Sequence, residues 1–176
     1  MAAFHERGMD VDEILVRRLW DNEECPYFDL IMRADGRIYP LQPNGQKIAD
    51  PYCTNSVAWM RISQLPGIDD SDNLNEGFAS LYRKDLPDLD LVLSCGECCS
   101  SGENGFVSLA RLSTGALIWL VFLTSSNPFE SAEIDQDEVI ATSTDGLKFI
   151  FRLENPESVR MVGKARLSYI AYEHTR

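Results

Sequence analysis

The sequence predicts an α+β protein, mainly an antiparallel β-sheet of about seven to nine strands with one or two helices, in a single domain spanning 1–176. Three observations predict this class. Only one stretch has a clear helical pattern, and apolar runs recur every 8 to 12 residues, separated by Gly, Pro, Asn and Asp. In addition, two Asp-Gly pairs lie between apolar runs, as in β-hairpins. An all-β barrel or sandwich is the alternative.

The helical pattern covers residues 10–22, which read DVDEILVRRLWDN. Asp10 is expected to cap this helix, and Glu13, three residues later, completes a capping box. Its predicted buried face consists of Val11, Ile14, Leu15 and Leu19. An extended conformation of EILVRRLW is the alternative.

The rest of the chain predicts strands and turns. Segments 27–32 and 37–41 flank Asp35-Gly36, and segment 139–153 repeats this arrangement around Asp145-Gly146. Further strand-like runs lie at 57–62, 78–83, 89–94, 106–112, 116–123 and 167–173. The run ALIWLVFL (116–123) is apolar on both faces, which predicts a central strand covered on both sides. The longest candidate loop is 63–77, and such loops are often functional or mobile.

The balance of charge is acidic. Sixteen basic and 28 acidic residues give a net charge of −12, which disfavours direct nucleic-acid binding and attracts basic partners. The N-terminal residues MAAFHERGMDVDEI lack the apolar region of a signal peptide, and the longest apolar run, eight residues, is too short to span a membrane. These observations predict a soluble cytoplasmic protein with reduced cysteines and no membrane association.

Three of the five cysteines, Cys95, Cys98 and Cys99, lie within SCGECCSSGENG (94–105). A C-x-x-C pair can hold zinc or act in redox chemistry, but zinc needs two further ligands with paired spacing, and the chain has none. Ser, Gly and Asn follow the cysteines and indicate a turn. We therefore predict a hairpin loop with inert thiols and no bound metal. Nucleotide phosphate motifs are also missing, so no cofactor is expected.

Catalytic motifs are scarce in this sequence. The two histidines, His5 and His174, lie near the termini, and no G-x-S-x-G motif accompanies them. A pair of carboxylates could support glycoside hydrolysis, but no spacing selects one pair among 28 acids. The sequence therefore nominates no catalytic residue.

Acidic residues gather in two clusters that contain no basic residue. The first cluster comprises Asp69, Asp70, Asp72 and Glu76, and the second comprises Glu130, Glu133, Asp135, Asp137 and Glu138. If the sheet brings them together, they would form one negative surface suited to a basic protein. These nine residues are the candidate partner-binding residues, with Trp59 and Tyr82 as candidate aromatic anchors; a solvated rim and core aromatics are the alternatives.

The segments ALIWLVFLTSSNPF (116–129) and VIATSTDGLKFIFRLENPESVRM (139–161) resemble the strand-turn-strand ending of several immunity proteins from bacterial toxin systems. The resemblance implies a non-enzymatic, cytoplasmic protein that inhibits a cognate toxin, such as a basic nuclease, by protein–protein contact. It assigns no functional residue by motif.

Two other functions stay open from the residues alone. One is a small-ligand-binding protein or carboxylate-dependent hydrolase built in a β cup, which a pocket with two carboxylates of separated pKa would favour. The other is a zinc-stapled interaction module, which would contain metal and respond to chelators.

Overall fold

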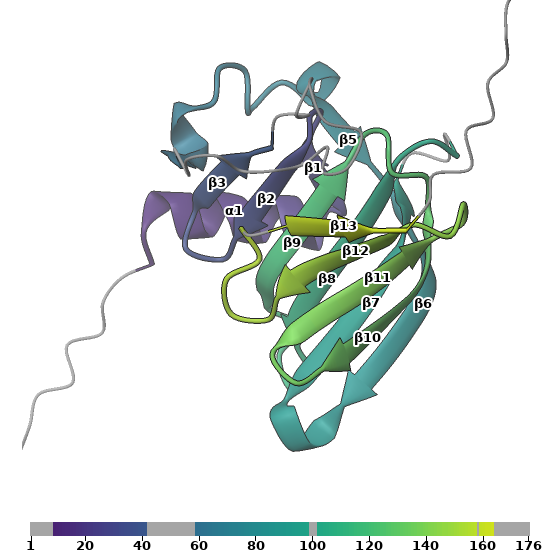
Figure 1. Ribbon diagram of the computed structural model, residues 1–176. Coiled ribbons are helices and arrows are strands. Elements are labelled where there is room, and N and C mark those ends of the chain that lie inside the picture. Colours follow the sequence, from purple (N-terminus) through teal and green to yellow (C-terminus); the bar gives the residue numbers. More distant parts are fainter. Residues whose placement is uncertain (1–8, 42–58, 99–101, 158, 164–176) are drawn as a thin grey trace, which may run out of the picture.

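The computed structural model describes residues 9–41, 59–98, 102–157 and 159–163. Within these ranges the chain forms one α-helix, three short 3-10 helices and thirteen strands, most of them in two antiparallel sheets. A four-stranded sheet packs on one face of a seven-stranded sheet, and the α-helix packs on the other face (Figure 1). The predicted α+β class is confirmed. The helix argues against an all-β chain, and neither described sheet closes into a barrel, whereas the packing of one sheet on the other is the layering of a sandwich.

The seven-stranded sheet has the order β4-β3-β2-β9-β8-β7-β6. Its strands are β4 (Met60–Arg61), β3 (Arg37–Pro40), β2 (Leu30–Arg33), β9 (Leu117–Leu123), β8 (Gly105–Arg111), β7 (Leu91–Cys98) and β6 (Phe78–Leu86). The apolar run at 116–123 becomes β9, the fourth of the seven. Trp119 and Val121 face the four-stranded sheet, and Leu120 and Phe122 face the helix. The prediction of a central strand covered on both sides is confirmed.

The four-stranded sheet has the order β10-β11-β12-β13. Its strands are β10 (Phe129–Asp135), β11 (Glu138–Ser143), β12 (Lys148–Arg152) and β13 (Val159–Val162). Alternate side chains, among them Phe149 and Phe151, are buried against the larger sheet. Phe129 meets Phe149 edge-on with ring centroids 5.2 Å apart, an arrangement that aromatic pairs favour.

The helix, α1 (Val11–Asp21), begins as the sequence predicts: the Asp10 amide donates to Glu13 Oε2 at 3.2 Å in a capping box. The predicted buried face is partly wrong. Leu19 is buried and Leu15 partly so, but Val11 and Ile14 are 64% and 51% exposed, and the inner face carries Asp12, Val16 and Leu19. The helix is therefore rotated about its axis so that the Asp12 carboxylate points inward.

Both Asp-Gly hairpins are confirmed. β2 pairs with β3 around Gly36, and β11 pairs with β12 around Gly146. Both glycines have positive φ, +82° and +85°, which a residue with a side chain rarely adopts. The turn residues therefore determine where these strands reverse.

Other strand predictions need correction. Within the segment 57–62, the described residues 59–62 form the two-residue strand β4 and the start of η1 (Ile62–Gln64). The predicted loop 63–77 contains the rest of η1, η2 (Ser71–Asn73) and the strand β5 (Leu74–Glu76). β5 pairs with β1 (Glu24–Pro26), and η3 (Pro87–Leu89) links β6 to β7. The sequence pattern missed β10 and β13. The predicted strand at 167–173 lies outside the described residues.

The Asp12 carboxylate joins α1 to the η1 segment. It is 4% exposed, and it accepts hydrogen bonds from the Ser63 amide at 3.0 Å and from Arg61 Nη1 at 3.2 Å. Burial alone raises the pKa of a carboxyl group, but the hydrogen bonds from Ser63 and the charge of Arg61 outweigh burial and lower the pKa of Asp12. The ionised form is therefore the one that the fold stabilises.

Replacing Asp12 with Asn is expected to lower the free energy of unfolding at pH 7 by about 1–3 kcal/mol, because a buried charged acceptor is lost. Because the pKa of Asp12 is lower in the folded than in the unfolded state, its ionised carboxylate stabilises the fold at pH values above the unfolded-state pKa. This stabilisation is lost as the pH falls through the folded-state pKa. The gap between wild type and Asp12→Asn should therefore close below about pH 4. Urea unfolding at pH 7, 5 and 3.5 measures this; a gap independent of pH would contradict it.

Candidate functional site

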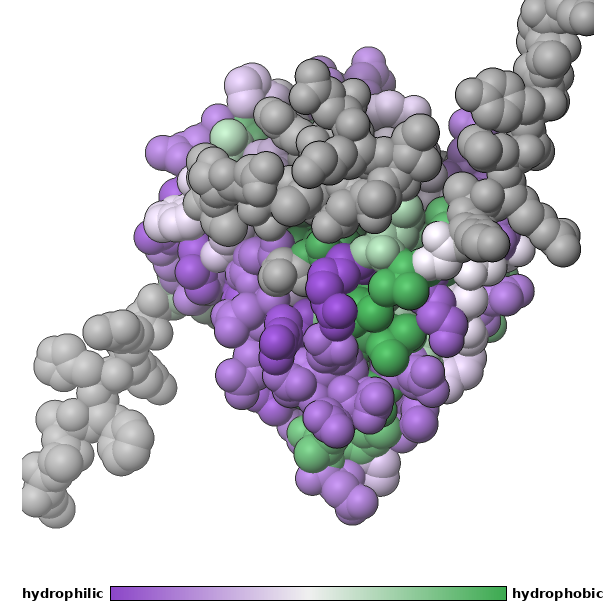
Figure 2. Space-filling model, viewed as in Figure 1, coloured by the Kyte–Doolittle hydropathy of each residue, from purple (hydrophilic) through white to green (hydrophobic). Residues whose placement is uncertain are grey.

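The four-stranded sheet presents one side to solvent, which we call the outer face. Because Ala132, Val139, Ala141, Phe149 and Phe151 point into the core, the alternate residues of each strand point outward. The outer face consists of Ser131, Glu133, Asp135, Glu138, Ile140, Thr142, Lys148, Ile150, Arg152, Arg160 and Val162. Figure 2 views this side and shows a hydrophobic area over β11 bordered by hydrophilic residues.

The strand register orders these residues in rows across the outer face. One row runs from Glu133 through Ile140 and Ile150 to Arg160, so two apolar side chains lie between an acid and a base. Val162, which lies opposite Lys148 at the start of β12, is 50% exposed. The outer face thus has an apolar centre with a charged rim, the composition of a protein interface.

Ion pairs neutralise one part of the second acidic cluster. Glu138 accepts from Arg160 Nη2 at 2.7 and 2.9 Å, and Asp137 is paired with Arg152. Glu130, Glu133 and Asp135 lie on the edge strand β10, are exposed, and have no ion pair with any residue that the structure describes. We call these three residues the β10 acids. They therefore lie on a strand.

The first acidic cluster lies elsewhere. Its segment packs through Ile68 and Leu74 into the core on the α1 side, whereas β10 packs on the opposite side of the seven-stranded sheet. Asp69 pairs with Arg18 Nη1 at 3.2 Å, and Asp70 accepts from the Asp72 amide at 3.1 Å. Asp72 and Glu76 are exposed. The two clusters therefore do not form one negative surface.

The three cysteines that the structure describes, Cys25, Cys95 and Cys98, are core residues. Cys95 and Cys98 lie on β7 and are fully buried, so the predicted hairpin loop begins later than expected. Burial raises the pKa of the Cys95 thiol to about 12, so it stays protonated and unreactive at neutral pH. Across the described ranges, no three His, Cys, Asp or Glu residues are close enough to hold a metal ion. Cys99 and both histidines lie outside these ranges.

The two aromatic candidates differ in exposure. Trp59 is 48% exposed, with the Arg37 guanidinium 6.0 Å from its ring centroid. Tyr82, on β6, packs against the core between the two sheets. Neither belongs to the outer face.

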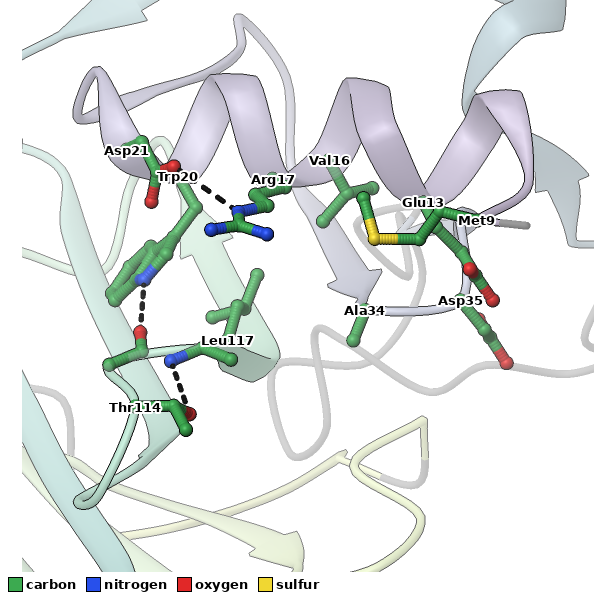
Figure 3. Close-up of a pocket in the computed structure, with 12 residues that line it drawn as sticks. Met9, Glu13, Val16, Arg17, Trp20, Asp21, Ala34, Asp35, Thr114 and Leu117 are labelled. Atoms are coloured by element: carbon green, nitrogen blue, oxygen red, sulfur yellow. Dashed lines mark hydrogen bonds and ion pairs between the residues drawn. The ribbon is translucent and has the colours of Figure 1, made fainter. Parts of the chain in front are cut away.

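A groove with a mostly apolar lining runs along α1, and no local sequence pattern indicated it. Its cavity volume is about 610 Å³. We call it the α1 groove; it is lined by Met9, Glu13, Val16, Arg17, Trp20, Asp21, Ala34, Asp35 and residues 114–117. Figure 3 shows Val16, Ala34 and Leu117 along its middle, Glu13 and Asp35 at one end, and Trp20 with Asp21 at the other.

Two polar contacts hold the Trp20 end of the α1 groove. The Trp20 indole Nε1 donates to the Gly115 carbonyl at 2.9 Å, and the Ala116 amide donates to Thr114 Oγ1 at 3.3 Å (Figure 3). On the rim, Arg17 Nε lies 3.6 Å from Asp21 Oδ2. The indole is therefore fixed by its polar edge.

Comparisons with protein-family models, with curated proteins and with solved structures found no match to this chain. Among the described residues, α1 and the shorter helices all lack the length and apolar character of a membrane-spanning helix.

Proposed function

We propose that this chain is a non-enzymatic binding protein of the immunity-protein kind, which inhibits a basic protein toxin through the outer face of its four-stranded sheet. The observation that carries the proposal is the composition of that face: an apolar centre of Ile140 and Ile150, with the β10 acids, which have no ion pair among the described residues, along one edge. An apolar centre favours burial against a partner, and the acidic edge selects a basic one.

Two further points support this assignment. The segments that resemble immunity proteins, 116–129 and 139–161, contain β9, β12 and most of β11 and β13, so the resemblance covers three strands of the sheet that carries the outer face, whereas β10, apart from its first residue, lies between the two segments. The net charge of −12 also speeds encounter with a basic protein at low salt.

A charge-reversal experiment tests the proposal. The triple variant Glu130→Lys/Glu133→Lys/Asp135→Lys raises the net charge from −12 to −6 and places three repulsive charges on the β10 edge. The partner would first be identified by native mass spectrometry of the protein purified gently from its source. We expect the variant to bind this partner about 100-fold more weakly or worse, because close interfacial charge pairs contribute about 1.5 kcal/mol or more each.

The matched control carries the same change of charge on the first cluster. Asp69→Lys/Asp72→Lys/Glu76→Lys also raises the net charge to −6, on exposed residues on the α1 side of the large sheet, and it keeps Asp70, which caps η2. We expect it to weaken binding by less than about threefold, through long-range attraction alone. Equal losses in the two variants, or recovery of the bare chain alone, would contradict the proposal.

A further inference from the structure

The dimensions of the α1 groove fit an elongated small molecule. The eleven residues of α1 span about 16 Å, and a cavity of about 610 Å³ along this length has a cross-section of about 40 Å². This cross-section admits an alkyl chain or one aromatic ring. The volume lies within the usual range of small-molecule sites.

The lining separates an apolar middle from two different ends. Val16, Ala34 and Leu117 supply the apolar middle, where a hydrocarbon body would displace water. At one end the fixed Trp20 indole offers its ring to a flat apolar group, because its N–H already donates to Gly115.

The other end carries the charge that selects a cation. Asp35 is paired with Arg37 Nη2 at 2.6 Å, whereas Glu13 has no ion pair within the described part of the chain and uses one oxygen, Oε2, to accept from the Asp10 amide. Glu13 and Trp20 are seven residues apart, about 10 Å along the helix. Of the three carboxylates that line the groove, Asp21 is paired with Arg17 and Asp35 with Arg37, so among the residues that the structure describes Glu13 is the one without an ion pair.

We propose that the α1 groove binds an elongated amphipathic amine, with a flat apolar group beside Trp20 and its ammonium group at Glu13. The site lies on the opposite side of the seven-stranded sheet from the outer face, so it is independent of the function proposed above.

An NMR titration tests this proposal with three probes of equal length. These are 4-phenylbutylammonium, the neutral 4-phenylbutanol and the anionic 4-phenylbutyrate, each followed by the Trp20 indole and Gly115 amide signals. We expect the amine to bind with a Kd on the order of 1 mM, as suits a ligand of this size. The alcohol should bind about fivefold more weakly, and the anion more weakly still.

Two variants assign the binding to the groove. Glu13→Gln keeps an acceptor for the Asp10 amide, so the capping box survives, and it should reduce the affinity for the amine to that for the alcohol. Ala116→Phe fills the groove from its exposed rim and should abolish the shifts that the amine and the alcohol cause. Equal binding of the amine and the alcohol to wild type, unchanged binding to Ala116→Phe, or no shift at about 20 mM amine would each overturn the proposal.

Discussion

Replacing Gly36 with alanine is expected to destabilise the protein by about 3–5 kcal/mol, from a strained backbone plus a steric overlap. Gly36 has φ +82°, and a Cβ added to it would lie 2.2 Å from Asp12 Cβ and 3.1 Å from the Asp12 carbonyl carbon. The Gly36 carbonyl also accepts from the Ile62 amide at 2.9 Å. Three elements therefore meet at this residue: α1, the β2–β3 turn and η1. A movement of any of them to make room for the new Cβ would break the packing on Asp12 or the hydrogen bond from Ile62.

Gly146 provides the matched control for Gly36. It occupies the same position in the other Asp-Gly hairpin, with φ +85°, but a Cβ there would meet nothing within 4 Å. Gly146→Ala should therefore cost only the backbone strain, about 1–2 kcal/mol. Urea unfolding of both variants measures the difference. If both lose the same stability, the close packing of α1 on the β2–β3 turn is wrong.

Trp119→Ala is expected to cost about 3–5 kcal/mol, because it opens a large cavity between the two sheets. Trp119 is fully buried, packs 6.3 Å from Phe151 between ring centroids, and donates from Nε1 to the Leu153 carbonyl at 2.9 Å. It thus ties the central strand β9 to the end of β12.

The comparison variant for Trp119 is Trp59→Ala. Because Trp59 is 48% exposed, its loss should change the free energy of unfolding by about 0.5 kcal/mol or less. Chemical denaturation of the two variants measures both effects. A loss at Trp119 no greater than that at Trp59 would mean that the four-stranded sheet does not pack on β9 as described.

The parts of the fold that the sequence predicted are those set by local chemistry. The Asp-Gly turns, and the run at 116–123 that is apolar on both faces, can each be recognised from a few adjacent residues. The inner face of α1 was predicted wrongly because Asp12 is stabilised inside by Arg61 and Ser63, about fifty residues away. β10 was missed because a bulge between Phe129 and Ser131 interrupts the alternation of a strand rich in acids, which favour strands weakly.

The candidate surfaces depend on pairing that sequence alone does not define. The apolar centre of the outer face exists because Ile140 lies opposite Ile150 in the register of β11 and β12. The α1 groove is formed by α1, the β2–β3 turn and residues 114–117, which are far apart along the chain. Charge clustering did identify the β10 acids, but only the arrangement of the layers separates them from Asp69, Asp70, Asp72 and Glu76.

Carboxyl footprinting of the protein, free and bound to its partner, tests most directly the claim that the outer face is the contact surface. The method labels exposed Asp and Glu side chains and reads each by mass spectrometry. We expect the partner to protect Glu130, Glu133 and Asp135 and to leave Asp72 and Glu76 labelled as in the free protein. Protection of Asp72 and Glu76 with the β10 acids still labelled would contradict it.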